Sequence, residues 1–121
     1  DVFLFLQNAQ KKKTQWDYVI CDPPSFARSA DQRKGAEKAY RKLMTQALGV
    51  VRPGGYFCAA SCTSQIGPAH FRRILAEASR AARLRLQIVH EVGQPFDHPV
   101  AIGHEEGRYL KFIEVRVLAR V

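Results

Sequence analysis

The chain has 121 residues, of which 46% are hydrophobic, and its formal net charge is +8. This length allows one domain with a modest hydrophobic core. A small basic domain often binds a polyanion such as RNA. Three cysteines without ligand spacing exclude a disulfide framework and a zinc site, and no apolar run is long enough to cross a membrane. We therefore expect a cytoplasmic protein without a metal and without membrane contact.

The first 21 residues predict a short helix and a strand. Asp1 is placed to cap a helix that carries Val2, Phe3 and Leu6 inward. Residues 16–21 form the first strand, and their near-continuous apolarity indicates burial on both faces, as in a parallel sheet.

A longer helix follows from about Gln32 to Val51, and Pro53-Gly54-Gly55 is expected to end it. Its apolar positions recur at spacings of three and four: Ala36, Ala39, Tyr40, Leu43, Met44, Ala47 and Leu48. Next comes an apolar strand, Tyr56 to Ser61. Basic residues are dense from Arg28 to Arg85, which indicates either contact with RNA or simply two solvated helix faces.

The second half of the chain predicts a helix over 68–83, a strand over 84–92, a polar loop over 93–108 and a strand over 109–118. Polar residues interrupt this last strand, as expected near the solvated side or end of a sheet: Lys111, Glu114 and Arg116. Helical connections imply parallel pairing, whereas the long loop favours an antiparallel hairpin. We expect an α/β fold with a mostly parallel sheet whose last strand is antiparallel.

Ligands of such sheets sit beyond the carboxyl ends of the strands. Three notable segments converge there under this topology: Asp22–Phe26, Ser61–Thr63 and Asp97–Arg108. Their convergence predicts a site at this edge of the sheet.

The segment Asp22–Phe26 combines a carboxylate, two prolines and an aromatic ring at the end of a strand. Pro23 and Pro24 end the sheet ladder and stiffen the backbone. An Asp22 carboxylate beside an exposed Phe26 ring suits a flat, polar, ring-shaped substrate. The alternative is a plain strand end with a Pro-Pro turn.

Cys62 is the candidate nucleophile, because it follows a strand near a helix start, where the helix N-terminus and nearby cations favour a thiolate. The alternative is a buried, inert thiol. Cys21 and Cys58 lie mid-strand and are expected to be small core residues. His98 is a base, a donor to a base edge, or a simple loop residue.

Several short motifs occur together in one order: Asp22-Pro23-Pro24-Ser25-Phe26-Ala27-Arg28, Pro53-Gly54-Gly55, Ser61-Cys62-Thr63, Asp97-His98-Pro99-Val100 and Glu106-Gly107-Arg108-Tyr109-Leu110-Lys111. Over essentially the whole chain they resemble the C-terminal half of the Rossmann-like class I S-adenosylmethionine (SAM)-dependent RNA methyltransferases. The most similar group is the bacterial large-subunit rRNA (cytosine-5) methyltransferases that carry a PUA domain.

This resemblance implies that Cys62 adds to C6 of a cytosine in rRNA and that Asp22 holds the amino/N3 edge of the base. Phe26 would stack on the flipped base. For the SAM cofactor, Asp1 would contact the adenine amino group, together with Asp22 and Pro23. The other substrate-binding positions that the resemblance implies are Pro23, Pro24, Arg28, His98 and Arg108.

The glycine-rich cofactor loop of these enzymes would lie before Asp1. Residues 1–121 are therefore expected to be a partial catalytic domain that binds little SAM and is inactive alone. The first strand would then present an apolar edge, which favours a homodimer. Two alternatives remain open: methylation of an exocyclic nitrogen such as guanine N2, and a non-catalytic basic module for RNA binding or dimerisation.

Overall fold

The computed structural model describes residues 1–104, 107 and 109–121. Its elements follow in the order α1 (Val2–Lys11), β1 (Trp16–Cys21), the 3-10 helix η1 (Ala30–Gln32), α2 (Arg33–Leu48), β2 (Val51–Ser61), α3 (Pro68–Ala81), β3 (Leu84–Val92) and β4 (Lys111–Arg120). The sheet order is β1-β2-β4-β3. β1 and β2 are parallel, and β4 is antiparallel to both β2 and β3, so only the last strand is reversed. The predicted mixed sheet is confirmed.

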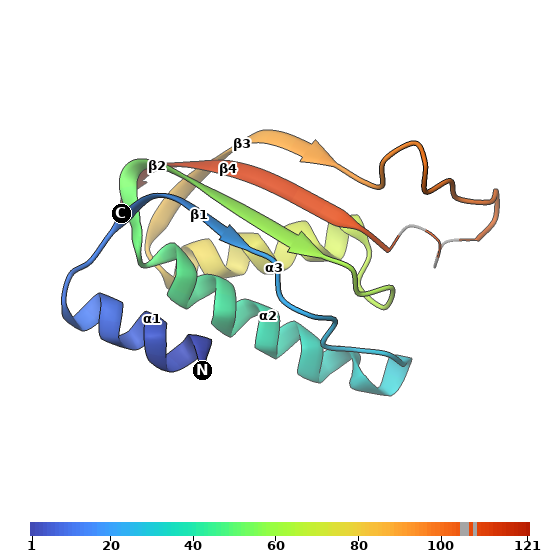
Figure 1. Ribbon diagram of the computed structural model, residues 1–121, viewed down its shortest axis with the longest axis horizontal. Coiled ribbons are helices and arrows are strands. Elements are labelled where there is room, and N and C mark those ends of the chain that lie inside the picture. The colour runs from blue at the N-terminus through green and yellow to red at the C-terminus, as the bar shows by residue number, and fades with distance from the viewer. Residues whose placement is uncertain (105–106, 108) are drawn as a thin grey trace.

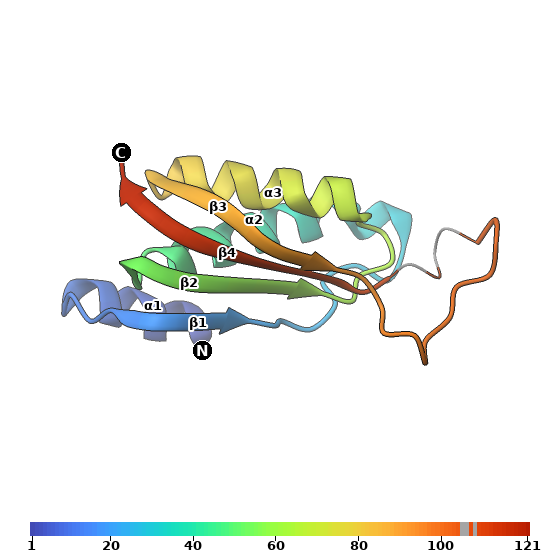
Figure 2. The same ribbon diagram turned by 90° about the horizontal axis from the view of Figure 1, so that it is seen from above.

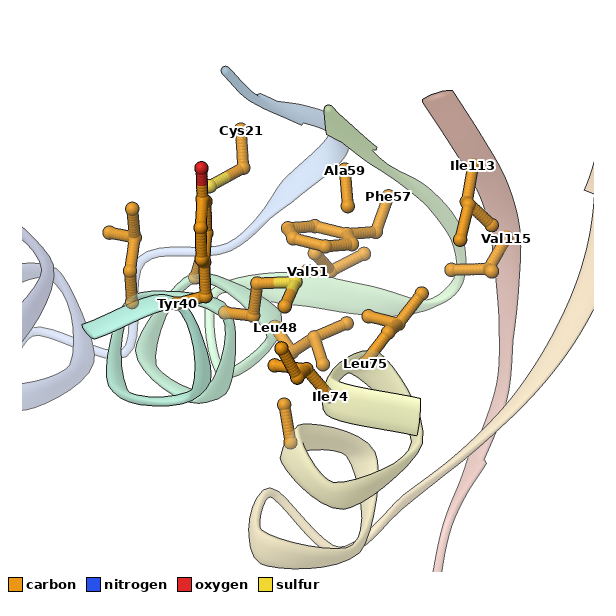
Figure 3. Close-up of a cluster of buried hydrophobic side chains, with 14 of the residues drawn as sticks. Cys21, Tyr40, Leu48, Val51, Phe57, Ala59, Ile74, Leu75, Ile113 and Val115 are labelled. Atoms are coloured by element: carbon orange, nitrogen blue, oxygen red, sulfur yellow. The ribbon is translucent and has the colours of Figure 1, made fainter. Parts of the chain in front are cut away.

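The three α-helices lie on one face of the sheet and leave the other face uncovered (Figures 1 and 2). Side chains from α2, α3, β2 and β4 meet between the layers and form the core. Figure 3 shows Leu48, Phe57, Leu75 and Val115 in this cluster, and each is no more than 3% exposed. No helix of the described residues is long and apolar enough to cross a membrane.

α1 begins as predicted. The carboxylate Oδ1 of Asp1 accepts hydrogen bonds from the backbone N–H groups of Phe3, at 2.7 Å, and Leu4, at 3.4 Å. This cap satisfies donors that a helix N-terminus leaves unpaired. Leu6 turns into the core and Phe3 packs against it, whereas Val2 stays 50% exposed.

β1 has the predicted bounds, but the prediction that it is buried on both faces is wrong. It is an edge strand, and its uncovered face carries Trp16, Tyr18 and Ile20, which are 38%, 46% and 67% exposed. The cause is the one-sided helical layer, because alternate side chains of a strand point to opposite faces. Only Cys21 of this strand is buried.

The predicted end of the long helix is also wrong. α2 ends at Leu48, and Pro53-Gly54-Gly55 lies inside β2. Pairing between β2 and β4 starts only at Tyr56, and the register with β1 shifts between Trp16 and Tyr18. A proline fits there because the ladder is irregular at that point.

Candidate functional site

An apolar pocket of about 530 Å³ lies where β1 ends, against the start of α1. Its walls combine the first turns of α1, the end of β1, the segment that follows it and one side of α2. The lining residues are Val2, Phe3, Phe5, Leu6, Val19, Ile20, Cys21, Asp22, Pro23, Pro24, Phe26, Leu43 and Ala47. The fold thus brings Asp22–Phe26 beside the residues that follow Asp1. A hollow of about 600 Å³ around Gln10 and Arg120 contains none of the predicted site residues.

In the segment after β1, the aromatic ring of Phe26 is placed differently from the prediction. Asp22 and Pro24 are exposed, and Pro23 is half-buried. The Phe26 ring is not freely exposed as expected; it is half-buried and lies edge-on against the Tyr40 ring at 4.7 Å. Part of the ring therefore belongs to the core, and the rest faces the pocket.

Cys62 is exposed at the end of β2, whereas its neighbours Ser61 and Thr63 are both 0% exposed. The Thr63 side chain hydrogen-bonds across to the other strand end, with 3.2 Å between its Oγ1 and the Oγ of Ser25. The structure therefore joins the segment 22–26 to the backbone that carries Cys62. This arrangement leaves the Cys62 thiol accessible on a firmly held turn.

Lys111, at the start of β4, is only 2% exposed, so its expected position at a solvated side or end of the sheet is wrong. Its ammonium group donates to the carbonyl oxygens of Thr63, at 2.5 Å, and Tyr109, at 2.7 Å. Burial lowers the pKa of Lys111 to about 8, and the neighbouring Cys62 opposes that shift. A cation beside the Cys62 turn is thus held by main-chain carbonyls.

The other predicted substrate-binding residues lie further out. Arg28 is exposed, and its backbone N–H donates to Gln32 Oε1 at 2.8 Å. His98 is exposed, with Nδ1 3.1 Å from Asp97 Oδ1, and it lines a hollow of about 410 Å³ that shares no residue with the pocket beside α1. Arg108 lies outside the described residues.

Cys21 and Cys58 are buried as predicted, and both are free thiols. Burial raises the pKa of Cys21 to about 11, with a further contribution from the charge of Asp22. Burial also raises the pKa of Cys58, whose sulfur lies 2.9 Å from the Tyr18 hydroxyl. A raised pKa disfavours the thiolate form that nucleophilic attack needs, and of the three cysteines only Cys62 is exposed. Within the described residues, no group of three or more His, Cys, Asp or Glu side chains is arranged to hold a metal.

Sequence reasoning assigned no role in the site to Tyr40, Ser25, Thr63 or Lys111. The helical spacing placed Tyr40 on the buried face of its helix, but spacing does not identify the partner of its hydroxyl. Ser25 and Thr63 each belong to one of the sequence motifs, but the hydrogen bond between their side chains is seen only in the fold.

No family model matches the chain. Searches of known proteins and of solved structures both find methyltransferases. A large-subunit rRNA methyltransferase I of Vibrio parahaemolyticus is 36% identical over 118 residues, and that of Erwinia tasmaniensis is 33% identical over 118 residues. Each match covers 98% of this chain and 30% of the relative. A solved methyltransferase complexed with SAH (S-adenosylhomocysteine) matches 97% of the chain with a TM-score of 0.81 and 25% identity, and the chain covers 30% of that structure.

The chain has a methyltransferase fold. A SAM-dependent methyltransferase from Streptococcus mutans shows the same fold, with a TM-score of 0.80 at 24% identity, and a Pyrococcus horikoshii homologue matches with a TM-score of 0.62. The chain spans about 30% of the length of the relatives it matches. It is thus related to one segment of these methyltransferases.

Proposed function

We propose that this chain is the nucleotide-holding part of a SAM-dependent RNA methyltransferase that methylates cytosine C5 in large-subunit rRNA. The observation that carries the proposal is the hydrogen bond between Ser25 and Thr63, which brings a base-gripping segment and an accessible cysteine to one edge of the sheet. The names of the relatives, large-subunit rRNA methyltransferase I, support the substrate class. This substrate would place the protein in the cytoplasm.

The chemistry follows from the weak nucleophilicity of cytosine C5. The Cys62 thiolate forms a bond to C6, and the electron pair of the C5–C6 double bond makes C5 nucleophilic. SAM, when bound, supplies the methyl group that C5 takes. Loss of the C5 proton to a base and departure of the Cys62 thiolate then restore the aromatic ring. Asp22 holds the amino/N3 edge, where charge develops during the attack.

The pocket beside α1 fits the adenine of SAM, because its walls are almost entirely apolar and Asp22 lines it. Asp1 is fixed at the start of α1 by its cap, directly before the lining residues Val2 and Phe3. Asp1, Asp22 and Pro23 are therefore the proposed contacts to the cofactor. Pro24, Phe26 and Arg28 continue along the same segment toward the base and the RNA backbone, and His98 and Arg108 belong to the loop that would approach the RNA.

We further propose that residues 1–121 form part of a catalytic domain whose glycine-rich cofactor loop is supplied by a preceding segment. The coverage of about 30% of the relatives supports this. The chain alone would then bind SAM weakly and transfer no methyl group. Isothermal titration of the 121-residue chain with SAM checks this, and tight 1:1 binding would contradict it.

The decisive experiment uses the full-length protein that carries this sequence, with rRNA as substrate. Cys62→Ser should abolish formation of 5-methylcytosine, read by bisulfite sequencing, and RNA containing 5-azacytosine should trap a covalent adduct on Cys62 of the unaltered protein. Cys58→Ala is the matched control and should keep both signals. Intact methylation by Cys62→Ser would contradict the cytosine-5 mechanism.

Methylation of an exocyclic nitrogen, such as guanine N2, is the second candidate. The exposed Asp22 carboxylate and the stiff prolines after it favour this reaction, because they suit an amino group and need no cysteine. N2-methylguanine in RNA treated with Cys62→Ser would support this reaction. RNA binding without any methylation would instead support a non-catalytic module.

A further inference from the structure

Thr63 is bonded within its own turn and to three other segments of the chain. Its Oγ1 lies 2.5 Å from the Tyr40 hydroxyl of α2 and 3.2 Å from Ser25 Oγ of the segment after β1. Its N–H donates to Ser61 Oγ at 3.1 Å, and its carbonyl oxygen accepts from Lys111 at the start of β4. The residue next to the candidate nucleophile is therefore the junction of the site.

Tyr40 is the buried centre of this junction. It is 1% exposed, and its hydroxyl lies 2.9 Å from Ser61 Oγ as well as 2.5 Å from Thr63 Oγ1. One hydroxyl thus holds the residue before Cys62 and the residue after it. The Tyr40 ring also packs edge-on against Phe26 of the base-gripping segment.

We propose that Tyr40 is a positioning residue, whose hydroxyl acts through Ser61 and Thr63 to hold Cys62 in register with the segment 22–26. The proposal rests on the proposed function, because the register matters only if Cys62 and Asp22 act on one base. Covalent attack requires reacting atoms within a narrow range of distance and angle, and a displacement of about 1 Å can lower a rate on the order of a hundredfold. A buried network of this kind supplies that precision, because moving any of its hydroxyl groups would leave a buried polar group without a hydrogen bond, which costs free energy.

The network also explains why Cys62 alone is exposed in its turn. Ser61 and Thr63 are fully buried because their hydroxyls are bound on the α2 side of the sheet. β2 ends at Ser61, and Cys62 follows it with its side chain exposed. Tyr40 therefore holds both neighbours of Cys62 in the buried layer, while the Cys62 side chain stays exposed.

The test is Tyr40→Phe in the full-length protein. This change keeps the ring contacts with Phe26 at 4.7 Å and Phe71 at 5.8 Å and removes only the hydroxyl. We expect kcat for methyl transfer to fall by about tenfold or more, with KM for RNA unchanged within twofold. Tyr18→Phe is the matched control, because its hydroxyl bonds Cys58 and Glu114 in another part of the sheet, and it should leave kcat unchanged.

A second readout does not depend on methyl transfer. Hydrogen exchange measured by mass spectrometry should speed up in both 25–28 and 62–65 of Tyr40→Phe, and in neither segment of Tyr18→Phe. An unchanged kcat, faster exchange in only one segment, or an equal loss of kcat in the control would overturn the proposal. If the unaltered protein methylates no cytosine, the proposed function fails, and the exchange data still decide whether Tyr40 couples the two segments.

Discussion

The Lys111 ammonium nitrogen lies 2.5 Å from the carbonyl oxygen of Thr63, and this charge-assisted hydrogen bond ties β4 to the turn that carries Cys62. Lys111 is 2% exposed, and no carboxylate in the described part of the chain forms an ion pair with it. Because this buried ammonium is held by carbonyl oxygens, we expect the stability of the turn to depend on pH.

Lys111→Met should reveal that dependence. The folded pKa of about 8 is below the usual 10.5, so between these values the unfolded chain binds more protons than the folded chain. The contribution of Lys111 is fully present above pH 10.5 and is lost as pH falls through 8. The free energy of unfolding of the natural protein, relative to Lys111→Met, should therefore rise by on the order of 1–3 kcal/mol from pH 7.5 to 10.5. Urea titrations of both proteins measure this, and a constant difference would contradict it.

Gly55→Ala should destabilise the pairing of β1 and β2. A Cβ at this position would lie 2.6 Å from the carbonyl oxygen of Asp17 and 2.9 Å from that of Arg52, and neither backbone atom can move cheaply. We expect a loss of about 1–3 kcal/mol in unfolding experiments. Gly35→Ala in α2 is the control, because a Cβ there meets nothing within 4 Å, and it should stabilise the helix by up to about 1 kcal/mol. Equal effects of the two changes would contradict this explanation.

Glu37→Gln should reduce the sensitivity of the protein to acid. His70 Nε2 lies 2.7 Å from Glu37 Oε1, and this contact between α3 and α2 is the main cause that lowers the pKa of Glu37. The resulting stability is present above the usual glutamate pKa and is lost as pH falls through the lowered value. Thermal unfolding between pH 6 and 3 should show a smaller decrease in melting temperature for the variant. A parallel decrease would assign acid sensitivity to other carboxylates.

Ile20→Lys should weaken self-association of the 121-residue chain. We propose that β1 pairs with a second copy, because it is an edge strand whose uncovered face is apolar, and Ile20 is 67% exposed on that face. A lysine on an edge strand opposes such pairing. Light scattering over a dilution series should show dimers for the natural chain and monomers for the variant. A natural chain that is monomeric at all concentrations would contradict the dimer.

Local patterns predicted the element types well but not every boundary. The apolar run from Trp16 to Cys21 and the stretch 84–92 matched β1 and β3 because turn residues flank both. Pro53 was read as a helix stop, although the irregular pairing at the start of β2 tolerates a proline there. The sequence also gave no indication that only one face of the sheet is covered, since that depends on tertiary packing.

The candidate site was predicted as a set of segments, and the contacts between them came from the fold. Strand ends and the topology placed Asp22 and Cys62 at one edge, and residues 22–26 and 61–63 do meet through Ser25 and Thr63. Lys111 was expected near the solvated side or end of the sheet because it interrupts the apolar residues of its strand. The buried Lys111 ammonium group is held by the carbonyl oxygens of Thr63, which is 48 positions away in the sequence, and of Tyr109, which is 2 positions away. A pattern of side chains does not predict acceptors that belong to the backbone.

β4 follows β3 in the chain but lies between β2 and β3 in the sheet. β2 and β3 are not paired with each other, so without β4 one edge of β2 is unpaired and β3 has no partner strand. β4 is therefore the strand that joins β3 to the rest of the sheet, and its pairing with β2 links distant parts of the sequence, a kind of contact that forms slowly. The bond from Lys111 to Thr63 therefore needs the C-terminal strand in its place, whereas the bonds from Thr63 to Tyr40 and Ser25 need no residue beyond 63.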